Sequence, residues 1–119
     1  RIPALATSAK GSLLCVYDMR HRAARDLQGD IDIGFSRSLD GGQSWEAPRV
    51  IMDMGEFGGL PQEQNGCSDP GILVDQQTGE IFCFARFFPA RSPARSPARS
   101  PASWLAIPRM ISSRRPLSL

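Results

Sequence analysis

Short apolar segments separated by turn residues fill the first 85 positions of this 119-residue chain. In one of them Ile31, Ile33 and Phe35 fall on one face, which is the period of a strand with a buried side. Asp32 and Ser36 fall on the other face, and Asp32 is expected to face solvent or a neighbouring element. No segment has convincing helical spacing. The pattern predicts an all-β fold with strands at residues 2–9, 11–19, 31–38, 45–52, 71–75 and 80–85.

The connections between these segments have the composition of loops and tight turns. Residues 20–30 and 55–66 are expected to be loops, and Gln-Gln-Thr-Gly at 76–79 predicts a hairpin in which the glycine supplies a positive φ. Pro48 predicts that its strand lies at a sheet edge. Four strands that each pair with the next form a meander, the unit of a β-propeller blade. A lone meander cannot bury its faces, so residues 1–85 are interpreted as about one and a half blades.

The composition changes abruptly after Ala85. Residues 1–85 contain all twelve acidic residues and seven basic ones, whereas residues 86–119 contain seven arginines and no acid. A Pro-Ala-Arg-Ser unit repeats from Pro89, and proline at every fourth position removes the backbone donors that a sheet needs. Residues 86–119 are therefore predicted to be an extended, disordered, basic tail that cannot build a sheet.

Two interpretations of this tail have different consequences. A shifted reading frame over a repetitive gene would make it non-native, and another frame is then expected to continue the second blade with a further S-x-D-x-G-x-x-W sequence. A native tail would instead bind polyanions through its arginines, with strong salt dependence. The frameshift is preferred because the change falls inside a predicted strand, so no nucleic-acid partner is expected.

Cysteine and histidine form no metal-binding pattern. Cys15, Cys67 and Cys83 lack the spacing of zinc ligands, and Cys15 and Cys83 lie in apolar runs typical of a core. The single histidine, His21, is interpreted as a loop residue, and neither a metal nor a cofactor is expected. No run of 18 apolar residues predicts a membrane span, and no signal peptide is visible.

One turn carries a more specific pattern, Ser-Leu-Asp-Gly-Gly-Gln-Ser-Trp at 38–45. An aspartate in a turn can accept hydrogen bonds from backbone N–H groups, and Gly42 can adopt a positive φ. Trp45 is expected to open the next strand and cover the turn. This S-x-D-x-G-x-x-W sequence resembles the Asp-box (BNR repeat) of sialidases and some other propellers. Ser38, Asp40, Gly42 and Trp45 are therefore assigned a structural role, and Asp40 is not expected to be an active-site acid.

Three further stretches resemble bacterial exo-α-sialidases (neuraminidases). They are RIP at 1–3, YDMRHRAARD at 17–26 and CSDPGILVDQQTGEIFCFA at 67–85, in the order and spacing of that family. The resemblance covers residues 1–85 and implies an N-terminal fragment of a six-bladed β-propeller. It also implies a glycosidase that releases terminal α-linked sialic acid, with sialylated glycans or glycoproteins as partners and an extracellular or periplasmic location.

The resemblance implies roles for four residues. Arg1 would bind the sialic acid carboxylate, since a guanidinium can bind a carboxylate through two hydrogen bonds. Arg20 and Asp69 would line the pocket for the 4-hydroxyl group of the sugar. Asp26 would be the acid/base that protonates the leaving oxygen and later deprotonates water. Outside that family context, Arg1 would be a frayed surface residue and Asp69 a turn residue before Pro70.

The acid/base assignment also has alternatives. Asp26 could be a solvated loop residue paired with Arg22 or Arg25. Asp30 and Asp32 are nearby competitors for the role, although spacing favours Asp26.

The chain departs from the family in its nucleophile. Sialidases attack with a tyrosine activated by a glutamate, since a carboxylate would be repelled by the anionic sugar. The only tyrosine here is Tyr17, in the first blade, where packing is the expected role. The family's tyrosine, glutamate and other two arginines belong to later blades, and Arg109, Arg114 and Arg115 follow no family motif. The chain alone is therefore expected to be inactive, and the alternative is a non-catalytic Asp-box propeller that binds carbohydrate or protein.

Overall fold

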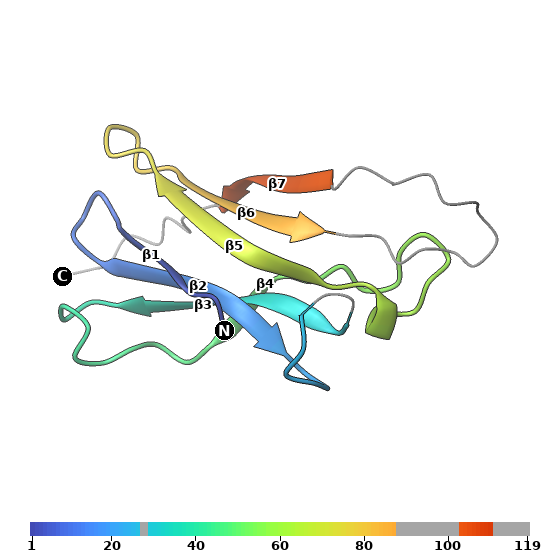
Figure 1. Ribbon diagram of the computed structural model, residues 1–119. Helices are drawn as coiled ribbons and strands as arrows, with labels where there is room; N and C mark the ends of the chain where they lie inside the picture. Colours follow the sequence, from blue (N-terminus) through green and yellow to red (C-terminus); the bar gives the residue numbers. More distant parts are fainter. Residues whose placement is uncertain (27–28, 88–102, 111–119) are drawn as a thin grey trace.

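The computed structural model describes residues 1–26, 29–87 and 103–110, and the regular structure of these residues is almost entirely β (Figure 1). None of the described residues belongs to a helix long and apolar enough to cross a membrane. The all-β prediction is confirmed. The elements are β1 (Ala4–Thr7), β2 (Leu13–Arg20), β3 (Ile31–Ser38), β4 (Arg49–Met52), the 3-10 helix η1 (Gln62–Gln64), β5 (Cys67–Val74), β6 (Ile81–Phe87) and β7 (Ser103–Met110).

The first four strands form an antiparallel sheet in chain order, β1-β2-β3-β4, so the predicted meander is confirmed. β2 and β3 pair along their whole length, from Leu13 opposite Ser38 to Arg20 opposite Ile31. This register gives the pair two distinct ends. One end holds Arg20 and the loop at 21–30, and the other holds the turn at 38–45.

β4 is shorter than the sequence predicted. It begins at Arg49, so the expectation that Trp45 opens this strand is wrong. Pro48 offers no N–H to a ladder at the point where the strand would have to continue. Before it, pairing is limited to the Glu46 N–H, which donates to the Arg37 carbonyl at 2.8 Å.

β5 and β6 form the hairpin that the sequence predicted. Gly79 has a φ of 74°, and its N–H donates to the Asp75 carbonyl at 2.8 Å. The Asp75 N–H in turn donates to the Glu80 carbonyl at 2.9 Å, which closes the turn. β5 begins at Cys67, four residues before the predicted start of the strand at position 71.

The second sheet has a third strand that the sequence did not predict. β6 continues past Ala85 to Phe87, and Ser103–Met110 pairs with it antiparallel as the edge strand β7. The prediction that no part of the tail can join a sheet is therefore wrong for these residues. The prediction of disorder for 88–102 and 111–119 lies outside the described residues.

The spacing of two prolines explains β7. Pro101 and Pro108 leave six consecutive residues with backbone donors between them, enough for a short ladder. The register against β6 is irregular between Ile81 and Cys83, opposite the part of β7 that contains Pro108. An edge strand with an irregular register tolerates a missing N–H, because one side of the strand needs no partner.

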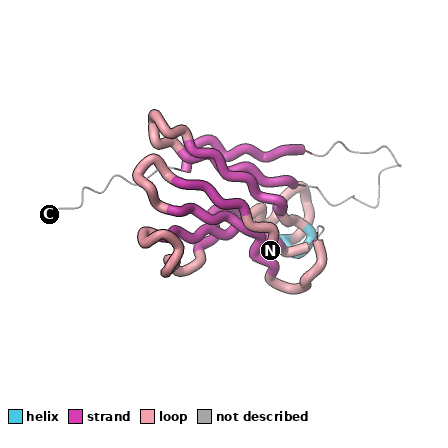
Figure 2. Tube along the Cα trace, turned by 60° about the vertical axis from the view of Figure 1, so that its left-hand side comes forward, coloured by secondary structure: helices cyan, strands magenta, loops and turns pink. Residues whose placement is uncertain are grey.

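The core lies between the two sheets, where β5 contacts β1, β2 and β3. Figure 2 shows the strands of both sheets in the middle of the molecule and the loops towards its ends. Cys83 is buried as predicted, whereas Cys15 is only half-buried, and all three cysteines are free. Burial raises the pKa of the Cys67 thiol to about 12 and that of Cys83 to about 11. The core cluster comprises Leu14, Val16, Ile33, Phe35, Met52, Cys67, Cys83 and Ala85.

β3 is buried on both faces, including the polar face. Asp32 and Ser36 lie against neighbours, not in solvent, and the Ser36 Oγ is 2.9 Å from the Tyr17 hydroxyl. Tyr17 and Met19 of β2 lean over Gly34, where an added Cβ would come within 2.7 Å of the Tyr17 ring and 2.6 Å of the Met19 sulfur. Glycine at this position therefore allows the side chains of β2 to cover β3.

Candidate functional site

Arg1 and Arg20 meet at the end of β2 on the carbonyl group of Ala24, and Asp26 is bound to Arg20. Arg1 Nη1 donates to this carbonyl at 2.9 Å, and Arg20 Nη1 donates to it at 2.6 Å. Arg20 Nη2 donates to Asp26 Oδ1, also at 2.6 Å. Residues 21–26 thus fold back over the strand that precedes them, so that Ala24 joins Arg1 to Arg20 and Asp26 binds Arg20.

Arg1 is anchored through its backbone, although its side chain is exposed. The terminal ammonium nitrogen donates to the Asp18 carbonyl at 2.8 Å, and the Asp18 N–H donates to the Arg1 carbonyl at 2.8 Å. Ile2 has a φ of 49°, an unfavourable conformation for a β-branched residue. These two hydrogen bonds keep Arg1 beside β2, so it is not a frayed terminus.

Arg20 is held by a buried carboxylate that the sequence analysis missed. Asp18 and Arg20 are two residues apart on β2, so their side chains share one face. Arg20 Nη2 donates to Asp18 Oδ2 at 3.0 Å, where the side chain of Asp18 has 0% of its surface exposed and that of Arg20 has 7%. The hydrogen bond to Asp18, followed by the contacts with Asp26, raises the pKa of Arg20 against the opposing effect of burial. The Asp-x-Arg spacing on one strand was the signal that could have predicted this pair.

Asp69 lies in a bulge of β5, not in a turn before Pro70. The register of β5 against β6 shifts where these two residues lie, and Asp69 has a φ of 54°. Its N–H donates to Asp18 Oδ1 at 3.2 Å, and its Oδ2 is 3.8 Å from Arg86 Nη1. Among the contacts of the described residues, Asp69 and Arg20 are not paired directly; the Asp18 carboxylate joins them.

An open hollow of about 500 Å³ lies over the end of β2. Its lining is Arg1, Asp18, Arg20, His21, Arg22, Ala23 and Ala24. The Asp26 carboxylate, 80% exposed, is bound to Arg20 from the loop. Three guanidinium groups around one hollow favour a carboxylate or another anion as ligand.

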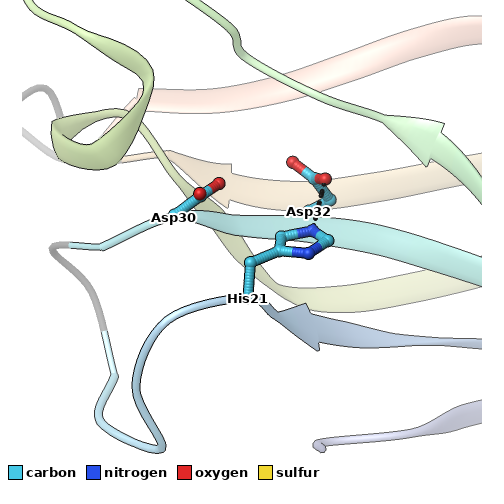
Figure 3. Close-up of side chains that lie close together, drawn as sticks. All are labelled: His21, Asp30 and Asp32. Carbon is cyan, nitrogen blue, oxygen red and sulfur yellow. Dashed lines mark hydrogen bonds and ion pairs between the residues drawn. The ribbon is translucent and has the colours of Figure 1, made fainter.

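The loop at 21–30 is clamped at its base by His21, Asp30 and Asp32 (Figure 3). His21 Nε2 lies 2.7 Å from Asp32 Oδ2, and the His21 N–H donates to the Asp30 carbonyl at 3.1 Å. Arg22 donates from Nε to Asp30 Oδ2 at 3.2 Å and from Nη2 to Glu63 Oε1 at 2.9 Å. Arg22 thus ties the candidate acid/base loop to η1. The sequence predicted His21 as a loop residue but did not predict its contact with Asp32.

The same three side chains are the group within the described residues whose ligand atoms lie close enough for a metal ion, within 4.8 Å of one another. His21 and Asp32 already bind each other, and Asp30 is paired with Arg22, so the clamp is complete without a cation. Burial raises the pKa of the Asp32 carboxyl, against the opposing hydrogen bond from His21. The two competitors for the acid/base role are thus engaged in the clamp, whereas Asp26 is on the exposed side of the loop.

The turn at 38–45 forms the hydrogen bonds predicted for it. Ser38 Oγ donates to Asp40 Oδ1 at 2.8 Å and accepts from the Gly42 N–H at 2.8 Å, and Gly42 has a φ of 96°. The Asp40 carboxylate accepts from both the hydroxyl and the N–H of Ser44, and these bonds hold its pKa well below the ordinary range. This turn lies at the end of β2 and β3 opposite the hollow, so Asp40 is far along the strands from Arg1, Arg20 and Asp26.

No family model matches the chain, but individual proteins do. The chain is 53% identical over 85 residues to a sialidase of Bacteroides fragilis, a match that covers 71% of this chain and 16% of the relative. Its structure is similar to that of the Hadza microbial sialidase Hz136, with a TM-score of 0.73, 46% identity, and coverage of 80% and 19%. It is also similar to a leech intramolecular trans-sialidase in complex with 2,7-anhydro-Neu5Ac, with a TM-score of 0.66, 29% identity, and coverage of 76% and 15%. The chain therefore spans less than a fifth of the length of each of these proteins.

Proposed function

The chain belongs to the sialidase family, and from this premise we propose that residues 1–85 form one side of the active site of an exo-α-sialidase. The reaction is hydrolysis of terminal α-linked sialic acid from glycans or glycoproteins. The observation that carries the proposal is that Arg1 and Arg20 both donate to the Ala24 carbonyl beside a basic hollow, while Asp26 is bound to Arg20. The fold of the whole protein is a six-bladed propeller, of which these residues supply about one and a half blades.

Arg1 binds the carboxylate of the sugar in this proposal. Its side chain is exposed, and the hydrogen bond that it makes to the described residues goes to Ala24, which leaves its other donors on the side of the hollow. Arg20 and Asp69 recognise the 4-hydroxyl group, with the guanidinium as donor and the carboxylate as acceptor. The short bridge between them through Asp18 supports a common role.

Asp26 acts as the acid/base. A carboxyl group can protonate the leaving glycosidic oxygen and then deprotonate the attacking water. Its side chain is 80% exposed and bound to Arg20, which supports this assignment, because the carboxyl group can reach a ligand while Arg20 holds it beside the hollow. Asp30 and Asp32 serve as clamp residues.

The nucleophile comes from outside this chain. Tyr17 points its hydroxyl to Ser36 within the first sheet, which supports a packing role. The tyrosine, its glutamate partner and the remaining carboxylate-binding arginines are supplied by later blades. The 119-residue chain is therefore inactive alone, and the turn at 38–45 acts as a structural Asp-box.

A hybrid sialidase tests the assignment, with residues 1–85 replacing the corresponding segment of the Bacteroides fragilis sialidase. The hybrid should cleave a fluorogenic sialoside, and Asp26→Asn should lower its turnover by roughly 10²–10⁴-fold. Asp30→Asn is the matched control and should retain most of the turnover in the fraction that folds. An equal loss in both variants would overturn the acid/base assignment.

Ligand binding distinguishes an enzyme segment from a non-catalytic binding propeller. In the proposed enzyme, Asp26→Asn strongly lowers turnover while sialic acid still protects the hybrid against thermal unfolding. The contrary result has two parts: the hybrid shows no turnover with aspartate at position 26, and it binds sialylated glycans equally well with aspartate or asparagine there. This result would contradict the proposal and indicate a binding module. The 119-residue chain by itself should release no product in the same assay.

A further inference from the structure

The Asp18 carboxylate is the link between the two sheets at the candidate site. Its side chain is completely buried, and it comes from β2 of the first sheet. Oδ2 accepts from Arg20 Nη2 at 3.0 Å and from Ser68 Oγ at 2.8 Å, while Oδ1 accepts from the Asp69 N–H at 3.2 Å. Ser68 and Asp69 belong to β5 of the second sheet, so one carboxylate contacts both halves of the site.

These contacts explain how the buried charge of Asp18 is tolerated and why Asp69 keeps a positive φ. A buried carboxylate is tolerated only when it is paired and hydrogen-bonded, and Asp18 has a cation, a hydroxyl and an N–H as partners. Asp69 has a positive φ, which a residue with a side chain keeps only where its surroundings impose it. The hydrogen bond from the Asp69 N–H to Asp18 is such a constraint, and it sits at the bulge that directs the Asp69 side chain.

We propose that Asp18 is a positioning residue that sets the distance between Arg20 and Asp69, and thereby the selectivity of the site for a hydroxyl group on the sugar ring. Asp18 fixes the guanidinium of Arg20 with one oxygen and the backbone of Asp69 with the other. The separation of the two recognition groups is therefore governed by the width of one carboxylate. This inference rests on the roles proposed above for Arg20 and Asp69, and it adds a residue that does not itself need to touch the sugar.

The test is substrate discrimination by the hybrid sialidase and its Asp18→Asn variant. Asparagine has nearly the same shape but no charge, so it cannot satisfy Arg20, Ser68 and Asp69 together. The substrates are a fluorogenic sialoside and its 4-deoxy analogue. We expect Asp18→Asn to lower kcat/KM for the hydroxylated substrate by about tenfold to hundredfold, and to lower it much less for the 4-deoxy substrate.

The ratio of the two kcat/KM values separates positioning from stability. This ratio does not depend on how much of the protein is folded, because misfolded molecules lower both values by the same factor. A ratio that falls towards one in Asp18→Asn supports the proposal. A ratio equal to that of the parent hybrid overturns it, since Asp18 would then be only a structural residue.

A second variant covers the case in which Asp18→Asn does not fold. Ser68→Ala removes the hydroxyl that joins β5 to the carboxylate but leaves the Arg20 contact in place, so it should fold and lower the ratio partially. Asp53→Asn, in the loop directly after β4, is the control and should leave the ratio unchanged. A parent hybrid that is active yet does not discriminate between the two substrates contradicts the roles of Arg20 and Asp69 themselves, whereas intact discrimination in Ser68→Ala contradicts only the role of Asp18.

Discussion

Arg20 and Asp26 form a 2.6 Å ion pair whose two members differ sharply in exposure. The side chain of Arg20 is 7% exposed, while that of Asp26 is 80% exposed. Arg20 also binds the buried carboxylate of Asp18, so the same guanidinium pairs with one buried and one exposed carboxylate. Exposed ion pairs contribute little to stability, whereas breaking a buried pair leaves an uncompensated charge, so the two contacts should respond differently to mutation.

Replacing Arg20 should destabilise the protein more than removing its exposed partner. Arg20→Met leaves the Asp18 carboxylate buried without its cation, whereas Asp26→Asn removes only the exposed contact. In the hybrid sialidase the thermal midpoint should fall clearly for Arg20→Met and hardly at all for Asp26→Asn. Equal thermal midpoints for the two variants would show that the buried charge of Asp18 does not need Arg20 to balance it.

Asp40 should make stability depend on pH at the acidic end. Hydrogen bonds from Ser44, first the hydroxyl and then the N–H, and from Ser38 lower the pKa of Asp40 in the folded protein. A lowered pKa contributes stability above the unfolded value of about 4 and loses it as pH falls towards the folded value. Asp40→Asn should therefore lower the thermal midpoint of the hybrid at pH 7, with a difference from the parent that shrinks as pH falls below about 4.

The pH series needs a matched variant at the same turn. Ser44→Ala removes the hydroxyl that donates to Asp40 and keeps the aspartate. Its thermal midpoint should therefore also lie below that of the parent at pH 7, by a smaller amount that likewise shrinks at acidic pH. If the thermal midpoints of Asp40→Asn and the parent differ by the same amount across pH 2–7, the stabilisation by this turn does not depend on the charge of Asp40.

Gly34 should not tolerate a side chain. A Cβ at this position would lie 2.6 Å from the Met19 sulfur and 2.7 Å from the Tyr17 ring, so Gly34→Ala should destabilise the hybrid by about 1–3 kcal/mol. Gly71→Ala is the matched strand variant, because nothing lies within 4 Å of its Cβ position and its φ is not positive. Denaturant unfolding measures both; a Gly34→Ala loss no larger than that of Gly71→Ala would show that the side chains above Gly34 move aside freely.

The isolated 119-residue chain should associate or remain partly unfolded. Leu5 is 61% exposed and Leu73 is 57% exposed, and both lie on strands where further blades are expected to pack. Size-exclusion chromatography with light scattering should detect oligomers, and Leu5→Lys with Leu73→Lys should reduce them. A monodisperse monomer of the unmodified chain with a cooperative thermal transition would contradict this expectation.

The local features of the fold followed from residues close together in the chain. The hairpin at Gly79 and the hydrogen bonds around Asp40 are properties of turn chemistry, which depends on a few adjacent residues. The strands of the first sheet followed from short apolar segments between such turns. β7 was missed because the repeated prolines obscured a short proline-free run beyond them.

The sequence by itself determined the meander of the first sheet, the hairpin of the second, and the resemblance that pointed to Arg1, Arg20, Asp26 and Asp69. Only the tertiary structure decided which of these groups meet. Asp18 and Asp69 are 51 residues apart and come together because the two sheets pack against each other. Whether a carboxylate is buried, and which partner then balances its charge, depends on that packing, because desolvation and hydrogen bonding arise from residues distant in the chain.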